Sequence, residues 1–289
     1  YQLVSRYIRD PQLRMTVSFH PLLIGGNPFS VTSVYTLISF LEQRYGVWSA
    51  MGGTGSIVKG MASLIEGQGG KIECNAEVEE ILVEQGAVRG VRLRDGRTLK
   101  SDLVVSNADA AWTYRHLIQP EHRKRWTNRK IERSHYSNGL FVWYFGTQGQ
   151  YPDVPHHSVI LGPRYRGLLD DIFKRKVLAE DFSLYLHRPT ETDPSLAPEG
   201  CDAFYALVPV PHLDADVDWP TYAETFKQRI CQRLEETMLP GLSDKIVTSR
   251  LLTPQDFQDR LNSFKGAGFG LEPRITQSAW FRPHNRSED

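Results

Sequence analysis

The chain has 289 residues, enough for one large domain or two of ordinary size, and 40% of them are hydrophobic, which is enough to build a core. Lys plus Arg and Asp plus Glu both number 34, so the basic excess that nucleic-acid binding needs is missing and we expect no nucleic-acid partner. Three irregularly spaced cysteines indicate neither a disulfide framework nor a zinc site, and we expect a reducing, cytoplasmic setting. No run approaches the roughly 18 apolar residues of a membrane helix, so any contact with a bilayer should be at its surface.

The first 45 residues predict a helical region. A short helix should break at Asp10-Pro11 and resume, because proline fits naturally in a first helical turn. Residues 20–29 then predict a loop or a helix end that contains Gly25-Gly26. A further helix should span residues 31–45 and bury apolar side chains on one face, namely those of Val34, Leu37, Ile38 and Leu41.

The stretch from residue 52 to 109 organises the remainder of the chain. After a glycine turn at residues 52–55, apolar residues recur at three- and four-residue steps and predict a helix with one buried face, formed by Ile57, Val58, Met61, Leu64 and Ile65. Gly69-Gly70 should end that helix. Short β-type runs follow, broken at Gly86 and at Asp95-Gly96, a strong hairpin signal. Residues 103–105 predict a strand buried on both faces.

The second half predicts a sheet. A helical stretch at 110–117 and a charged loop through Arg133 precede five probable strands, at residues 139–146, 157–161, 182–187, 204–210 and 245–252. Only two helices separate them, near residues 168–173 and 222–234, with Thr221 as expected N-cap and Gly241 as the stop. Helical crossovers cannot join all five strands, so we expect a largely antiparallel or mixed sheet covered on one face.

Common catalytic and metal motifs are missing. The turn at residues 52–55 lacks the third glycine of a dinucleotide fingerprint, since Val58 stands in its place. The nine histidines predict no metal site, because the adjacent His156 and His157 would face opposite ways in a strand and neither H-x-H nor H-E-x-x-H occurs. No G-x-S-x-G elbow indicates acyl transfer.

Several longer motifs carry a resemblance. They are Gly69-Gly70-x-x-x-x-Asn75-Ala76-x-Val78, the closing Ser106-Asn107-Ala108-Asp109, and the segments at residues 20–29, 45–55, 195–201 and 277–286. Together they resemble the bacterial-type phytoene desaturases, within the carotenoid desaturase and flavin amine oxidase group, over essentially the whole chain. That family opens with a strand and a G-x-G-x-x-G turn and closes with a second glycine-rich segment. Neither pattern is present between Tyr1 and Asp289, so we expect an internal fragment that does not hold FAD by itself.

The resemblance implies a mixed α/β (α+β) fold. It comprises part of a flavin amine oxidase-like FAD domain and a substrate domain with a mixed sheet. Residues 1–45 would lie on the substrate and membrane side, 46–115 in the centre of the FAD domain and 116–275 in the substrate domain, with 276–289 returning towards the FAD domain. Candidate FAD contacts are Val78, through its backbone, and Gly53, Asn107 and Ala108. Val78 could equally be an ordinary strand residue, and Asn107 and Ala108 a simple turn.

The resemblance implies FAD-dependent desaturation of phytoene towards lycopene, with carotenoid intermediates and a membrane surface as partners. The flavin would carry most of the chemistry, which fits a sequence that reveals no catalytic acid or base. Phe141, Trp143 and Phe145 share one strand face and would line either a sheet core or a hydrocarbon channel. Asn138, Arg164 and Arg166 stand at strand ends and are further cavity candidates, with surface positions as the alternative. Rival functions are another carotenoid desaturase or isomerase, or a non-enzymatic hydrophobic binding protein.

Overall fold

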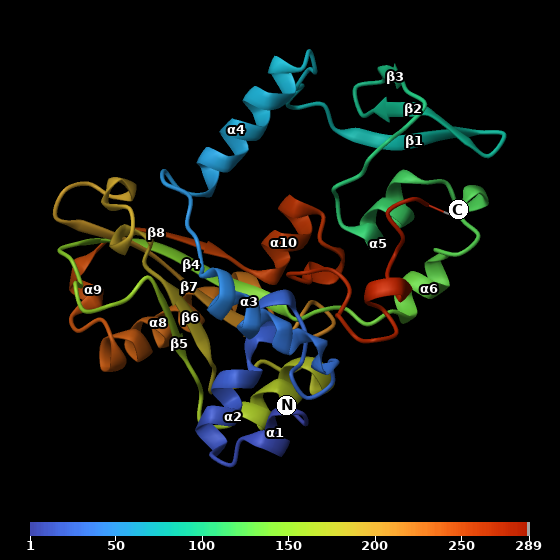
Figure 1. The fold of residues 1–289 in the computed structure, drawn as a ribbon. Coiled ribbons are helices and arrows are strands. Elements are labelled where there is room, and N and C mark those ends of the chain that lie inside the picture. The colour runs from blue at the N-terminus through green and yellow to red at the C-terminus, as the bar shows by residue number, and fades with distance from the viewer. Residues whose placement is uncertain (288–289) are drawn as a thin grey trace.

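The computed structural model describes residues 1–287, and its largest element is a five-stranded sheet (Figure 1). The strands lie in the order β5-β6-β7-β4-β8, and every neighbouring pair is antiparallel. Their bounds are β4 (Gly139–Gln148), β5 (His157–Ile160), β6 (Leu184–His187), β7 (Cys201–Val210) and β8 (Ile246–Leu252). All five predicted strands and the antiparallel pairing are therefore confirmed.

One face of this sheet forms the main core. Phe141, Trp143 and Phe145 alternate along β4 and are fully or almost fully buried. They face α8 (Trp219–Thr237), and the Phe141 and Phe226 rings meet edge to face with centroids 5.0 Å apart. Burying each such aromatic side chain contributes about 1.5–3 kcal/mol. The side chain of Asp218, one turn before the predicted N-cap, caps the helix by accepting from the Thr221 N–H.

The opposite face of the sheet is only partly covered. Tyr144, Tyr205 and Tyr185 follow one another across β4, β7 and β6, with ring centroids 5.6 Å and 5.7 Å apart. Tyr144 is 41% exposed, although its chain neighbours Trp143 and Phe145 are buried. The strand alternation thus separates an apolar core face from a tyrosine-bearing open face.

A smaller antiparallel sheet carries the predicted hairpins. Its strands are β1 (Val78–Glu84), β2 (Ala87–Leu93) and β3 (Thr98–Lys100), in that order. Gln85 and Gly86 connect the first pair with φ values of 51° and 73°, as a tight hairpin requires. At Gly90 a Cβ would lie 2.0 Å from the Leu99 carbonyl oxygen, so only glycine allows the strands to approach there.

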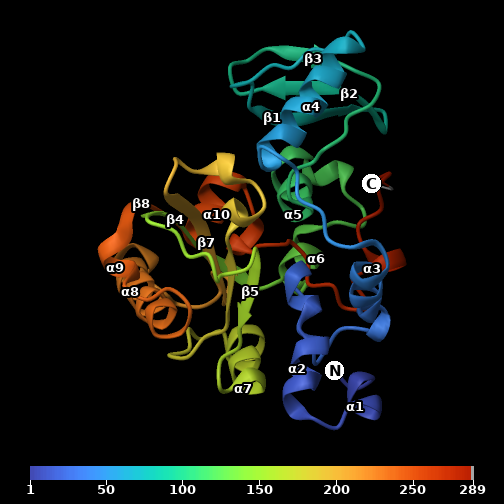
Figure 2. The same cartoon turned by 60° about the vertical axis from the view of Figure 1, so that its left-hand side comes forward.

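Two apolar segments differ from the predicted burial. The expected helix forms as α4 (Thr54–Gly67), but none of its residues is buried, and Figures 1 and 2 show it standing away from the five-stranded sheet. The expected buried strand at 103–105 is irregular, with Leu103 74% and Val105 84% exposed. Periodicity predicts an apolar face, whereas burial needs a second element, and no described residue covers these faces.

The N-terminal helices are α1 (Val4–Tyr7), α2 (Pro11–Ser18), the 3₁₀ turns His20–Ile24 and Ser33–Thr36, and α3 (Leu37–Tyr45). The predicted break is confirmed, because the Asp10 side chain caps α2 by accepting from the Leu13 N–H at 2.9 Å. The predicted burial in residues 31–45 is wrong, since Val34, Leu37 and Leu41 are 59%, 50% and 43% exposed.

Shorter elements complete the chain. They are α5 (Ala110–Trp112), a π-helical turn (Thr113–Leu117), a 3₁₀ turn (Pro120–His122), α6 (Asn128–Arg133), α7 (Tyr165–Asp170), a second π-helical turn (Asp171–Arg175), 3₁₀ turns at Pro189–Glu191 and Pro194–Leu196, α9 (Leu242–Lys245), α10 (Pro254–Leu261), and 3₁₀ turns at Phe264–Gly266 and Ala279–Phe281. The periodicity argument missed α10, which a capping box between Thr253 and Asp256 starts.

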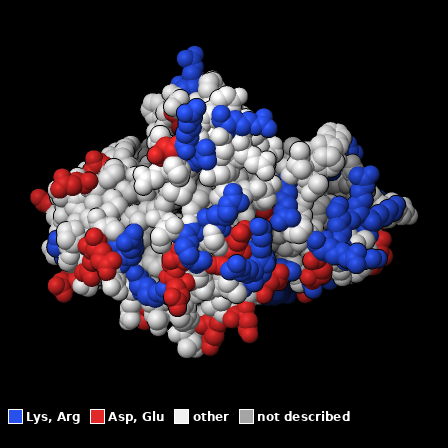
Figure 3. Space-filling view, turned by 90° about the horizontal axis from the view of Figure 1, so that it is seen from below, with Lys and Arg blue, Asp and Glu red and all other residues white. Residues whose placement is uncertain are grey.

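Acidic and basic residues are interspersed over the face shown in Figure 3, with Lys and Arg more frequent towards the α6 side. Among the described residues, no helix combines the length and apolarity needed to cross a bilayer.

Candidate cofactor site

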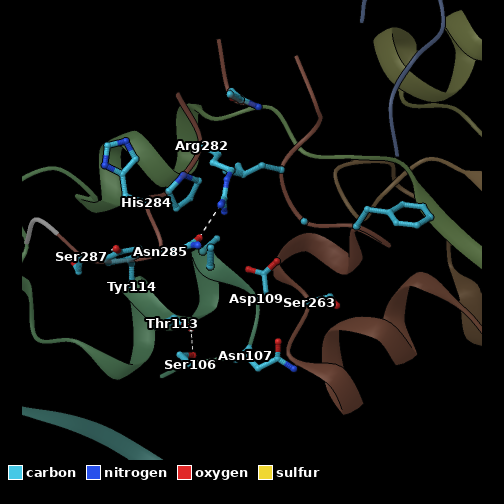
Figure 4. A pocket seen from close by; sticks show the side chains of 18 of the residues that line it. Ser106, Asn107, Asp109, Thr113, Tyr114, Ser263, Arg282, His284, Asn285 and Ser287 are labelled. Carbon is cyan, nitrogen blue, oxygen red and sulfur yellow. Dashed lines mark hydrogen bonds between the residues drawn. The ribbon is translucent and has the colours of Figure 1, made fainter. Parts of the chain in front are cut away.

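An open cavity of about 840 Å³ lies where four distant parts of the chain meet. Residues 104–118 form one wall and residues 261–287 another (Figure 4). Ile81 and Val88 of the β1–β2 hairpin and Tyr35 also line the cavity. Its volume falls within the range of about 300–1,000 Å³ that is typical of small-molecule and cofactor pockets. The cavity is therefore the leading candidate for a ligand site.

Local hydrogen bonds shape the first wall. Asp109 caps α5, its Oδ1 accepting from the Trp112 N–H at 2.9 Å, and the preceding Asn107 and Ala108 line the cavity edge. Ser106 Oγ lies 2.7 Å from Thr113 Oγ1, which ties this edge to the following helical turn. Burial raises the pKa of Asp109, and hydrogen bonds from backbone N–H groups partly offset that effect.

The opposite wall approaches Asp109 closely. Gly270 has a φ of +70°, and a Cβ there would lie 3.1 Å from Asp109 Oδ2, so glycine suits both the backbone and the space. Further along, the Arg282 guanidinium donates to Asn285 Oδ1 at 2.7 Å (Figure 4). Hydroxyl, amide and guanidinium groups thus line an otherwise apolar pocket. Such a mixture suits a ligand that has both polar or anionic groups and apolar portions.

The structure brings only part of the predicted cofactor set together. Asn107 and Ala108 line the cavity with the hairpin, whereas Val78 begins β1 and does not line it. Gly53 immediately precedes α4, and a Cβ on Gly53 would lie 3.5 Å from the Leu196 side chain. The N–H of the neighbouring Gly52 donates to the Asp193 carboxylate.

Sequence reasoning did not single out Asp109, Ser263 or Arg282 as site residues, although all three line the cavity. Arg282 lies within the motif at residues 277–286, so the family resemblance could have identified it as a candidate site residue. Nothing in the sequence alone showed that this segment lines the same cavity as Asn107.

The five candidate substrate residues occupy different environments. Phe141 and Trp143 are fully buried in the core against α8 and offer no surface to a ligand. Arg164 pairs with Asp171 at 3.0 Å and with Asp181, and Arg166 stacks over the Phe29 ring with its guanidinium carbon 3.8 Å from the centroid.

Asn138 is also buried. Its Nδ2 donates to the Gly139 carbonyl, while its Oδ1 accepts from no described residue. Its own carbonyl accepts from the N–H of Gly268, one residue before Phe269 of the cavity wall.

The prediction about histidines needs correction. His156 and His157 do not face opposite ways, because β5 begins only at His157 and strand alternation does not apply to the residue before it. Their rings lie 4.3 Å apart, and His187 joins them from β6. The three histidines form a group whose ring nitrogens could hold a metal ion, contrary to the expectation from spacing alone.

Comparisons with known proteins agree with this architecture. The family model described as flavin containing amine oxidoreductase matches residues 2–289. The chain is 53% identical over its whole length to the neurosporene-forming phytoene desaturase of Cereibacter sphaeroides and 51% identical to the lycopene-forming phytoene desaturase of Pseudescherichia vulneris. It covers 57% and 59% of those two proteins, so it spans somewhat more than half the length of each.

Solved structures share the fold at low sequence identity. An oxidoreductase from Methanosarcina mazei matches with a TM-score of 0.59 and 20% identity, over 87% of this chain and 55% of that protein. Putrescine oxidase bound to putrescine matches with a TM-score of 0.57 and 14% identity, over 86% of this chain and 52% of that protein. The fold and the family match together show that the chain belongs to the flavin containing amine oxidoreductase family.

Proposed function

We propose that this chain is part of an FAD-dependent desaturase that removes hydrogen from CH–CH pairs of phytoene on the way to lycopene. The observation that carries the proposal is identity of 46–53% over essentially the whole chain to several phytoene desaturases, combined with a cofactor-sized cavity. Similar desaturases differ in product: that of C. sphaeroides forms neurosporene, that of P. vulneris lycopene and that of Myxococcus xanthus zeta-carotene. Lycopene is therefore the proposed product, and neurosporene and zeta-carotene are the alternative products.

We assign the cavity between residues 104–118 and 261–287 to FAD. The bound flavin would accept the hydrogen removed from substrate, while this chain would bind and orient the cofactor. Asn107 and Ala108 present backbone groups at the edge, and the Arg282 guanidinium offers the donors that phosphate oxygens prefer. Val78 and Gly53 remain proposed contacts, although they do not line this cavity.

Substrate would approach from outside the main core. Because α8 covers the Phe141 and Trp143 face, we place the substrate wall at the open face of the sheet, with Tyr144 and Tyr205. Aromatic rings there would contact a polyene without leaving polar groups unpaired. Asn138, Arg164 and Arg166 remain candidates at the ends of this region.

We further propose that α3 and the residues after it contact a membrane surface, where phytoene would be found. Exposed apolar side chains are concentrated there, with Phe40 57%, Val47 64% and Trp48 88% exposed. An aromatic and aliphatic surface of this kind fits interfacial binding, which buries apolar groups at the headgroup boundary.

The test of function is a chimera. The segment of the C. sphaeroides desaturase that matches this chain is replaced by residues 1–289, and the chimera is produced in bacterial cells that accumulate phytoene. We expect coloured desaturated carotenoids, which absorption spectra and retention times identify as lycopene, neurosporene or zeta-carotene. A flavin-loaded chimera that leaves phytoene unchanged would refute the proposed reaction.

The cofactor assignment is tested in the same chimera. Arg282→Glu places a negative charge in the cavity and should lower flavin content at least about tenfold, the effect of losing a charge-assisted contact to phosphate. Arg260→Glu, on α10 but outside the cavity lining, is the matched control and should keep its flavin. Equal flavin content in the two variants would remove Arg282 from the proposed site.

A further inference from the structure

Three histidines meet at one edge of the five-stranded sheet. His157 of β5 lies directly opposite His187 of β6 in the strand register, and His156 immediately precedes β5. One ring nitrogen from each residue lies within 4.8 Å of the other two. The group comes from two strands that are about 30 residues apart in the chain, and it does not line the candidate cofactor cavity.

Hydrogen bonds orient two of the rings. His156 Nδ1 contacts Thr192 Oγ1, and His157 Nδ1 lies 2.6 Å from the Tyr185 hydroxyl. A neutral imidazole has one N–H and one lone pair, so if each Nδ1–H donates to its hydroxyl, each Nε2 carries a lone pair, and that of His156 faces His187 Nε2 at 2.8 Å. This is the arrangement by which outer hydrogen bonds orient metal-binding histidines.

His187 lacks a comparable partner on one side. Its Nε2 lies 2.8 Å from His156 Nε2, whereas its Nδ1 is buried and has no hydrogen-bond partner among the described residues. A buried nitrogen without a hydrogen-bond partner is unfavourable. The three rings alone therefore do not satisfy all of their polar atoms.

Negative charge lies near the group, which favours a bound cation. Glu191 interacts electrostatically with His156, and Glu42 with His157.

We propose that His156, His157 and His187 form a binding site for a divalent transition metal ion, with Zn²⁺ as the preferred occupant. Imidazole nitrogens suit Zn²⁺, and three protein ligands leave a fourth tetrahedral position for water or another ligand. Zn–N bonds of about 2.0–2.1 Å place ligand nitrogens about 3.3 Å apart. His156 and His187 would move apart slightly from 2.8 Å, and the exposed His157 ring would turn inward.

The test is metal titration of purified, metal-free protein, carried out on both the 289-residue chain and the chimera. Zn²⁺ binding is followed by calorimetry, and Co²⁺ is used as a spectroscopic probe because its visible absorption distinguishes tetrahedral sites. We expect one equivalent of Zn²⁺ per chain with a dissociation constant in the micromolar range or below, and a tetrahedral Co²⁺ spectrum.

Variants assign the ligands. His157→Asn changes an exposed ring and should weaken Zn²⁺ binding at least tenfold without unfolding the protein, which circular dichroism verifies. Tyr185→Phe removes only the hydroxyl beside His157 and should weaken binding by about 10- to 100-fold, the usual effect of losing an outer hydrogen bond. His122→Asn, outside the group, is the matched control and should bind normally. Lack of stoichiometric binding by the unmodified protein, or unchanged affinity in His157→Asn, overturns the proposal.

Discussion

A buried ion pair includes Arg188, which immediately follows His187 of the histidine group, and its contribution to the free energy of unfolding can be measured. Arg188 and Asp202 are 5% and 1% exposed, and Arg188 Nε donates to Asp202 Oδ2 at 3.0 Å. Asp202 also accepts from the Tyr151 N–H at 2.8 Å and from the Thr190 hydroxyl at 2.6 Å. One carboxylate thus ties β7 to two loops.

Asp202→Ala should destabilise the protein by about 3–5 kcal/mol, the usual cost of removing one member of a buried pair. The guanidinium keeps Glu191 and the Val154 carbonyl as partners, which limits the loss. Against this, Tyr151 and Thr190 lose their acceptor, and each unsatisfied buried donor costs about 1–3 kcal/mol. Because the contributions are not additive, the expected total stays near the range for a broken pair.

Urea unfolding followed by circular dichroism measures this difference. Arg94→Ala removes the exposed pair with Glu77, in which the side chains are 68% and 53% exposed, and should cost less than about 1 kcal/mol. The double variant Arg188→Met with Asp202→Leu should cost less than the sum of the two single changes, because no buried charge is left unpaired. A loss for Asp202→Ala no larger than that for Arg94→Ala would refute the reasoning.

Two further predictions concern pH and lipid. Burial, reinforced by the Lys176 ammonium, lowers the pKa of His212 from 6.5 to about 4, so the unfolded chain binds more protons in this interval. The free energy of unfolding should therefore be steady above pH 6.5 and fall as the pH drops towards about 4, less steeply in His212→Gln; a profile that is flat or rises on acidification would contradict this. Phe40→Glu should reduce co-sedimentation with phosphatidylglycerol vesicles several-fold, whereas Val247→Glu, a matched change at a 62% exposed residue of β8, should not. Equal vesicle binding by the two variants would argue against α3 as the contact surface.

Local pattern was sufficient for much of the secondary structure. The alternation of Phe141, Trp143 and Phe145 predicted both a strand and a shared face, and the Asp95-Gly96 turn predicted a strand reversal. These signals depend on backbone preferences within a few residues, which the surrounding fold leaves unchanged. The helix at Thr54–Gly67 was predicted for the same reason.

Only the tertiary structure decided which faces and which distant residues meet. Whether the Phe141 face lines a channel or a core depended on α8, whose contact with β4 spans about 80 residues of sequence. The cavity requires Asn107 and Arg282 to lie on facing walls, and the histidine group requires β5 and β6 to pair in one particular register. Apolar periodicity predicts that a helix has an apolar face, but it does not show which element packs against that face. The sequence therefore predicted the helix α4 but not the exposure of its apolar side chains.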